Sequence, residues 1–261
     1  MPVANADVGS HVLVASAVAP LNAEPRAASE QLSQSLAGHA AEILEVRDGW
    51  RRVRLEDGYE GWMHEGYLGA AAASVRDARL SLGCTVREGA QGVERALPFG
   101  ARVPRDATIV SGEAVEDAER RTRFPATGAA IASSAERWFA GTSYEWGGIT
   151  PWGADCSGMV QAAFALHGVA LPRDARIQAE QGKVVMASRE SWRPGDLLFF
   201  SERADGRITH VALVANADTL MHVAIGRGGF AVERLDQPLD AYAVGLIGRL
   251  RSARRILGTS A

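Results

Sequence analysis

The chain has 261 residues, a length that suits one large domain or two to three small ones. Its composition, 47% hydrophobic and 23% charged, is that of a globular protein, and its net charge of −3 argues against nucleic acid as the main partner. Two cysteines exclude a disulfide framework, and no run reaches the roughly 18 apolar residues of a membrane helix, so no membrane partner is predicted.

The N-terminal segment from Met1 to Asp7 lacks the basic region of a secretory signal, and the first Lys or Arg is Arg26. The apolar stretch from His11 to Pro20 is more typical of a first strand than of a signal core. Unless a leader preceded Met1, the sequence predicts a cytoplasmic protein.

Residues 8–70 are predicted to form a small all-β barrel. The pairs Asp48-Gly49 and Asp57-Gly58 are strong hairpin signals between alternating apolar runs. The clearest strand-like runs are residues 12–14, 43–46, 50–55 and 59–63. Residues 70–73 are predicted to be a connector, and residues 74–124 a second small barrel, because three weaker runs repeat the same pattern there.

Residues 126–258 are predicted to form an α+β domain. Apolar residues at helical spacing predict a helix over 127–139, and a second helix is expected over 156–167, between an Asp155 N-cap and Gly168. Five strands are expected to follow, near 196–201, 210–215, 219–224, 230–235 and 244–250. Helices first and an antiparallel sheet afterwards is the α+β pattern.

Cys156 is the candidate nucleophile, because it lies at the start of a predicted helix in the polar stretch Asp155-Cys156-Ser157-Gly158. Unpaired N–H groups and the helix dipole favour a negative charge there, so we expect a lowered thiol pKa. Asp155 opposes this effect unless its carboxylate is engaged elsewhere.

His210 and His222 are the candidate bases, on two predicted strands joined by the turn Asn216-Ala217-Asp218. If 215 pairs with 219, then 212 pairs with 222, and the two histidines are diagonal neighbours on one face, about 7–8 Å apart at the backbone. A helix packed over that face would bring Cys156 to His210, with His222 orienting the imidazole. A one-residue slip of the register would separate them.

A structural role is the alternative for each of these residue types. A single cysteine is most often a small buried side chain, an interpretation that suits Cys84. A structural role is also predicted for the four other histidines, His11, His39, His64 and His167. The sequence has no cluster with metal-ligand spacing, so neither a metal nor another cofactor is predicted.

Residues 127–257 resemble the NlpC family of cysteine peptidases, and the combination of motifs is more specific than any one of them. The matching pieces are Tyr144-x-Trp146-Gly147-Gly148, Asp155 to Gln161, Leu171-Pro172-Arg173-Asp174, Trp192 to Phe200 and His210 to Val214, with His222 further on. The resemblance implies a papain-like α+β fold. It also implies hydrolysis of the bond between γ-D-glutamyl and a diamino acid in the stem peptides of bacterial peptidoglycan.

The same resemblance implies roles for individual residues. Cys156 would be the nucleophile, His210 the general base and acid, and His222 the third polar residue. Tyr144 matches a tyrosine that lines the active site near the oxyanion. Asp155 and Ser157 match family positions that help hold the N-terminal end of the substrate. Ala175 departs from the family, which often has a serine there, and this puts one substrate hydrogen bond in doubt.

The N-terminal half resembles the two bacterial SH3-like modules that precede the peptidase in one subgroup. There the first module closes one end of the cleft, and the enzyme accepts stem peptides with a free N-terminal L-Ala. Residues 29–34 and 57–62 match its characteristic segments. Glu30 and Tyr59 are therefore candidates for contacting the substrate amine, with Glu24 as the alternative to Glu30, because a buried ammonium needs carboxylates to offset its desolvation.

These features predict a γ-D-glutamyl-L-diamino acid endopeptidase that acts on L-Ala-γ-D-Glu-diamino acid peptides in cell-wall recycling. An amidase or acyltransferase using the same thiol is one alternative, and a non-catalytic binder of wall fragments is another. The sequence leaves open the choice between meso-diaminopimelate and lysine, and the oligomeric state.

Overall fold

The computed structural model describes residues 7–70, 78–87, 92–186 and 188–258. The chain divides into two compact units, residues 1–120 and 121–261. The predicted connector at 70–73 and the predicted start of a second domain at residue 74 lie mostly outside the described residues. The division into domains at 8–70, 74–124 and 126–258 stays a prediction.

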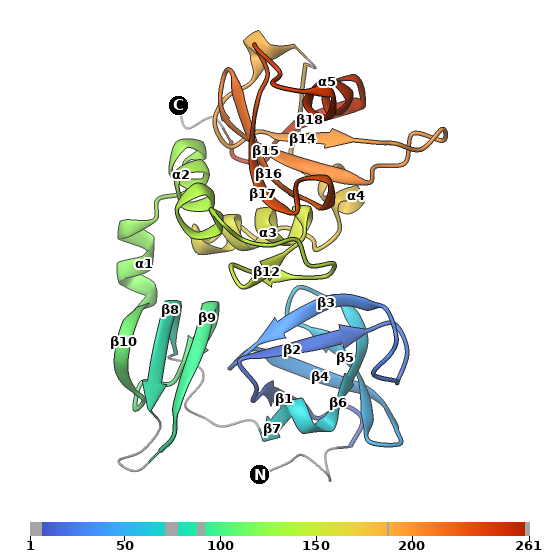
Figure 1. The fold of residues 1–261 in the computed structure, drawn as a ribbon. Helices are drawn as coiled ribbons and strands as arrows, with labels where there is room; N and C mark the ends of the chain where they lie inside the picture. The colour runs from blue at the N-terminus through green and yellow to red at the C-terminus, as the bar shows by residue number, and fades with distance from the viewer. Residues whose placement is uncertain (1–6, 71–77, 88–91, 187, 259–261) are drawn as a thin grey trace. The chain divides into compact units, whose positions relative to one another are not determined.

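The first unit begins with a curled antiparallel sheet of seven strands (Figure 1) in the order β3-β2-β6-β5-β4-β1-β7. Alternate side chains point into an apolar core that includes Leu21, Ile43 and Met63. Asp48 and Gly49 have φ values of 44° and 80°, which fits the predicted tight hairpin. The strands are β1 His11–Val14, β2 Val18–Asn22, β3 Gln31–Leu36, β4 Ala40–Arg47, β5 Trp50–Leu55, β6 Glu60–His64 and β7 Leu68–Ala70.

The predicted second barrel is an open three-stranded sheet in the described residues, ordered β10-β8-β9, with a helix after it. The strands are β8 Arg79–Arg87, β9 Glu94–Val103 and β10 Thr108–Val115, and the helix is α1 Asp117–Arg123. The helix was missed because its sequence has no apolar stripe. It is supported instead by acidic residues in its first turn and by the ion pair of Asp117 with Arg120 at 2.7 Å.

The second unit is built on an antiparallel sheet ordered β13-β18-β14-β15-β16-β17. Helices α2 and α3 lie on one side of this sheet and α5 on the other (Figure 1). The strands are β13 Lys183–Val185, β14 Leu197–Phe200, β15 His210–Asn216, β16 Thr219–Ala224, β17 Gly229–Arg234 and β18 Leu250–Arg255, with a short pair β11 Ile149–Thr150 and β12 Gly153–Ala154. The helices are α2 Gly128–Phe139, α3 Cys156–Leu166, α4 Ala175–Gln178 and α5 Ala241–Gly248.

The helix predicted over 156–167 is confirmed, and the strand predicted over 244–250 is wrong. Residues 241–248 form α5, and β18 begins only at Leu250. The apolar run at 241–248 suits either a buried strand or a helix. Asp240 favours the helix, because its carboxylate accepts a hydrogen bond from the Ala243 N–H at 3.0 Å and caps the N-terminus.

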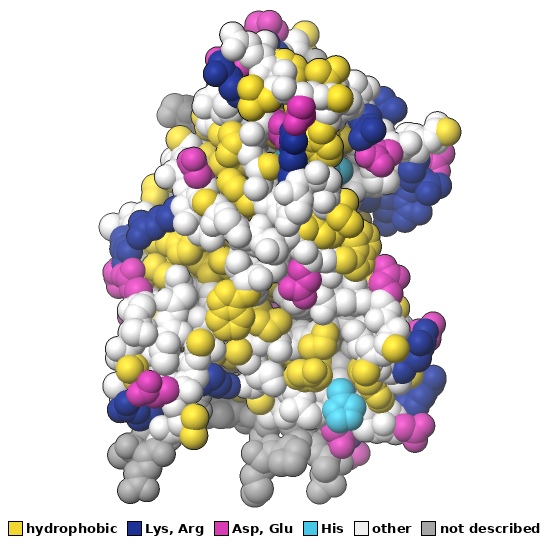
Figure 2. All heavy atoms as spheres, viewed as in Figure 1, with side chains coloured by type: hydrophobic (Ala, Val, Ile, Leu, Met, Phe, Trp, Pro, Cys, Tyr) yellow, Lys and Arg dark blue, Asp and Glu magenta, His cyan; other side chains and the backbone are white. Residues whose placement is uncertain are grey.

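Charged side chains of both signs lie beside one another on the face shown in Figure 2. Arg203 and Asp205 form one exposed ion pair, at 2.7 Å, and water screens the attraction in pairs of this kind. None of the helices in the described part of the chain combines the length and hydropathy needed to cross a membrane.

Candidate active site

Cys156 is the first residue of α3, and Asp155 holds it there as the N-cap. The Asp155 carboxylate accepts the Gly158 N–H at 2.8 Å, as predicted. Glycine is needed at 158 because a Cβ there would lie 2.1 Å from the carbonyl oxygen of Gly148. The motif therefore places a thiol at the first turn of a helix that packs closely against the preceding loop.

The Cys156 sulfur lies at the start of β15, where the backbone N–H of Val211 hydrogen-bonds to it. The Ser157 N–H makes a second such bond. Val211 directly follows His210, so α3 brings the nucleophile to the strand end that carries the candidate base.

His210 and His222 form a hydrogen-bonded pair, with 2.8 Å between His210 Nε2 and His222 Nδ1. The predicted register is confirmed toward the histidines, because Leu213 pairs with Met221 and Val214 with Leu220. The predicted pairing of 215 with 219 is wrong, because an irregularity beside the turn pairs Thr219 with Asn216 instead. The bond to His222 engages Nε2 of His210 and leaves Nδ1 for another partner.

The helix over the histidine face is α5 and not α3. Ala212 and Val214, which share the face of His210, pack in one cluster with Leu246 of α5. Cys156 therefore approaches the end of β15 from the other side of the sheet. The expectation that its helix covers the histidine face is wrong, because the location of the covering helices is a tertiary feature that strand periodicity does not determine.

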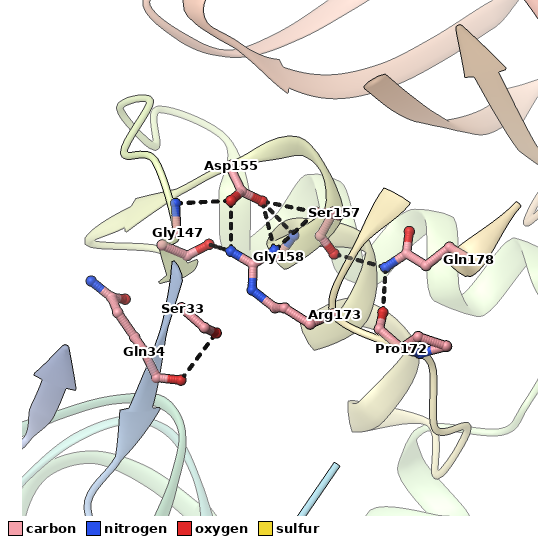
Figure 3. A network of polar contacts seen from close by, with 10 residues as sticks. Ser33, Gln34, Gly147, Asp155, Ser157, Gly158, Pro172, Arg173 and Gln178 are labelled. Atoms are coloured by element: carbon pink, nitrogen blue, oxygen red, sulfur yellow. Dashed lines mark hydrogen bonds and ion pairs between the residues drawn. The ribbon is translucent and has the colours of Figure 1, made fainter. Parts of the chain in front are cut away.

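Asp155, Ser157 and Arg173 form a buried polar network beneath the start of α3 (Figure 3). Arg173 pairs with both Asp155 oxygens, Nη2 to Oδ2 at 2.6 Å and Nη1 to Oδ1 at 3.0 Å, and donates to Ser157 Oγ at 2.9 Å. Gly147 N–H also donates to Oδ2 at 2.9 Å, and Ser157 Oγ donates to Oδ1 at 3.1 Å. These donors occupy the acceptor sites of the Asp155 carboxylate.

Arg173 is a site residue that the sequence reasoning left without a role. The Leu-Pro-Arg-Asp motif drew attention to this arginine, but the motif alone does not show which carboxylate pairs with the guanidinium. Gln178 of α4 adds to the same region, because its Nε2 donates to Ser157 O at 3.1 Å and to Pro172 O at 2.8 Å. Ala175, the first residue of α4, lies on this short helix.

The candidate nucleophile Cys156 and the candidate base His210 both favour their neutral forms near pH 7. Burial, followed by the charge of Asp155, raises the pKa of the Cys156 thiol to about 12, and the Val211 and Ser157 N–H groups and Arg173 offset this only in part. Burial and then His222 lower the pKa of His210 to about 3. The expected lowering of the thiol pKa is therefore wrong, because desolvation outweighs the helix terminus.

Tyr144 is half-buried beside the thiol. Burial raises the pKa of its phenol to about 12, with the charges of Cys156 and Asp155 as smaller causes. The phenol keeps its proton and can donate a hydrogen bond. Glu24, Glu30 and Tyr59 belong to the first unit, where Glu24 pairs with Arg26 at 2.7 Å and Tyr59 packs against the barrel core. Their contact with a bound peptide stays a prediction.

Comparison with known proteins gives two matches within the chain. Residues 141–244 match the NlpC/P60 family, and residues 21–68 match the bacterial dipeptidyl-peptidase Sh3 domain. A crystal structure of an NlpC/P60 family protein from Bacillus cereus has a TM-score of 0.77 and 18% identity, covering 95% of this chain and 100% of that one. The predicted papain-like α+β fold is confirmed.

The similar curated proteins are named as peptidases. A γ-D-glutamyl-L-lysine dipeptidyl-peptidase of Bacillus subtilis is 42% identical over 86 residues, which are 33% of this chain and 28% of that protein. The match to a protein of the same name in Bacillus cereus covers 34% of it, so about a third of these relatives is aligned. A probable endopeptidase of Haemophilus influenzae is 32% identical over 127 residues, 48% of this chain and 77% of that protein.

Proposed function

The chain belongs to the NlpC/P60 family, and on that premise we propose that it is a cysteine peptidase that hydrolyses the γ-D-glutamyl-L-diamino acid bond of peptidoglycan stem peptides. The observation that carries the proposal is the position of Cys156. It lies at a helix start, and its sulfur accepts a hydrogen bond from the N–H of Val211, the residue after His210. His210 in turn is hydrogen-bonded to His222 at 2.8 Å. The names of the similar dipeptidyl-peptidases support the choice of bond.

In the proposed reaction the neutral thiol loses its proton as it attacks. His210 Nδ1 takes the proton while the sulfur–carbon bond forms at the γ-glutamyl carbonyl. Tyr144 donates to the developing oxyanion. His210 then gives the proton to the departing amine as the carbon–nitrogen bond breaks, and water hydrolyses the thioester to restore the thiol.

The proposed substrate is L-Ala-γ-D-Glu-diamino acid with a free N-terminal amine, as released in cell-wall recycling. The match of residues 21–68 to a dipeptidyl-peptidase Sh3 domain supports this class of substrate. Glu30 and Tyr59 are the proposed contacts of the amine. Asp155 and Ser157, predicted for the same role, already hydrogen-bond to each other and to Arg173. A cytoplasmic location would suit this role and stays a prediction.

The test is incubation of the purified protein with the tripeptide, its N-acetylated form and intact sacculi, with products identified by mass. Release of the diamino acid from the free peptide supports the proposal, and product masses from transfer or deamidation would support the amidase or acyltransferase instead. Equal cleavage of free and acetylated peptides would contradict the free-amine requirement. Cys156→Ala should abolish turnover, while Cys84→Ala, at the other cysteine, should retain it.

A further inference from the structure

The ring nitrogen of His222 that does not face His210 lies close to a buried carboxylate. Glu233 on β17 is the diagonal cross-strand neighbour of His222, because Leu220 pairs with Glu233 and His222 with Ala231. His222 Nε2 lies 3.4 Å from Glu233 Oε1, and both side chains are almost completely buried, at 0% and 4% exposure. No role was predicted for this glutamate from the sequence.

We propose that Glu233 is a positioning residue that fixes which nitrogens of His222 and His210 carry protons. A carboxylate can only accept hydrogen bonds, so His222 Nε2 must be the donor to Glu233. A His222 ring with a single proton, held on Nε2, accepts at Nδ1, and the 2.8 Å bond then makes His210 Nε2 a donor. This arrangement leaves the lone pair of His210 on Nδ1, the atom that the proposed reaction uses as the base.

Arg227 keeps the carboxylate ionised and in place. Its Nε donates to Glu233 Oε1 at 2.6 Å and its Nη2 to Oε2 at 2.9 Å. Burial acts to raise the pKa of Glu233, but the bonds from His222 and Arg227 outweigh it and lower the pKa. Asp240, the N-cap of α5, holds Arg227 from the far side at 2.7 Å, and the guanidinium lies over the ring of Tyr242.

A merely structural ion-pair cluster is the competing explanation, since Glu233, Arg227 and Asp240 join β17 to the start of α5. The two explanations differ for Glu233→Leu. Leucine offers His222 Nε2 no acceptor, so the proton is no longer held there and the donors along the pair reverse in part of the molecules, which puts a proton on His210 Nδ1. Glutamine would not make this test, because its oxygen can replace Oε1 and accept from both Arg227 Nε and His222 Nε2. Asp240→Asn is the matched control, because it disturbs the cluster and leaves the Glu233 carboxylate facing His222.

The test is ¹⁵N NMR of the histidine rings in the full chain, together with alkylation and peptide kinetics. The wild type and Asp240→Asn should show His210 protonated at Nε2, and Glu233→Leu should show a fraction of His210 protonated at Nδ1. Because the 3.4 Å contact is long, we expect about a 100-fold loss of kcat with little change in KM for Glu233→Leu.

The measurement of kcat and KM rests on the proposed function. The NMR signature and the rate at which iodoacetamide alkylates Cys156 can be measured even if the protein is not a peptidase. An absence of turnover in the wild type, with the expected ring signature, would refute the peptidase and keep the positioning role. A wild-type His210 protonated at Nδ1 would overturn the positioning role even if Glu233→Leu failed to fold. An unchanged signature in a folded Glu233→Leu variant would overturn it as well.

Discussion

Replacement of Arg173 by methionine should destabilise the second unit strongly, because it leaves a charge without its partner. The Arg173 side chain is 2% exposed and that of Asp155 is 9%. Without the guanidinium, the Asp155 carboxylate keeps three neutral donors, from Gly147, Ser157 and Gly158. Breaking a buried ion pair on one side costs about 3–5 kcal/mol, so we expect a loss of that size for Arg173→Met.

A double-variant cycle tests whether the charges of Arg173 and Asp155 depend on each other for their effect on stability. Asp155→Asn keeps a good N-cap but removes the carboxylate charge that faces the buried Arg173 guanidinium, so it should destabilise the wild type. In the Arg173→Met background the same change removes the uncompensated charge, and it should stabilise the protein. The predicted effect of Asp155→Asn therefore changes sign between the two backgrounds.

The suitable measurement is native-state hydrogen exchange of peptides from α3, which reports the free energy of opening of this helix separately from the first unit. A loss below about 1 kcal/mol for Arg173→Met would refute the reasoning. The same destabilisation by Asp155→Asn in both backgrounds would refute it too, because the two charges would then be independent.

Three further outcomes follow from the site. Between pH 6.5, the unfolded pKa of His210, and its folded pKa of about 3, the unfolded chain carries a proton on His210 that the folded protein lacks. Lowering the pH through that window should therefore reduce the free energy of unfolding, by about 1.4 kcal/mol per pH unit more in the wild type than in His210→Gln. Urea unfolding at stepped pH measures this, and equal slopes would exclude a buried neutral imidazole. Tyr144→Phe should lower kcat about 100-fold, with a smaller change in KM, if the phenol donates to the oxyanion; unchanged kcat in steady-state assays would remove that role. Ala175→Ser should lower KM for the tripeptide by about fivefold, the effect of one hydrogen bond of roughly 1 kcal/mol, and no change would show that α4 does not reach the substrate.

The local features of the site could be predicted from the sequence, because each depends on residues close together in the chain. The cap at Asp155, the helix start at Cys156 and the register of His210 against His222 follow from side-chain preference and a period of two. The partner of Arg173 and the raised thiol pKa could not be predicted, because both depend on packing between distant segments. Helix α5 was missed for a related reason, since an apolar run alone does not distinguish a strand from a helix.

The bond from Val211 N–H to the Cys156 sulfur has a mechanical consequence. Val211 is joined by one peptide bond to His210, the proposed base, and that bond is planar and stiff. A shift of α3 along the sheet would have to break the Val211 bond before it moved the thiol away from this strand. The position of the thiol is thereby tied to β15 as well as to its own helix.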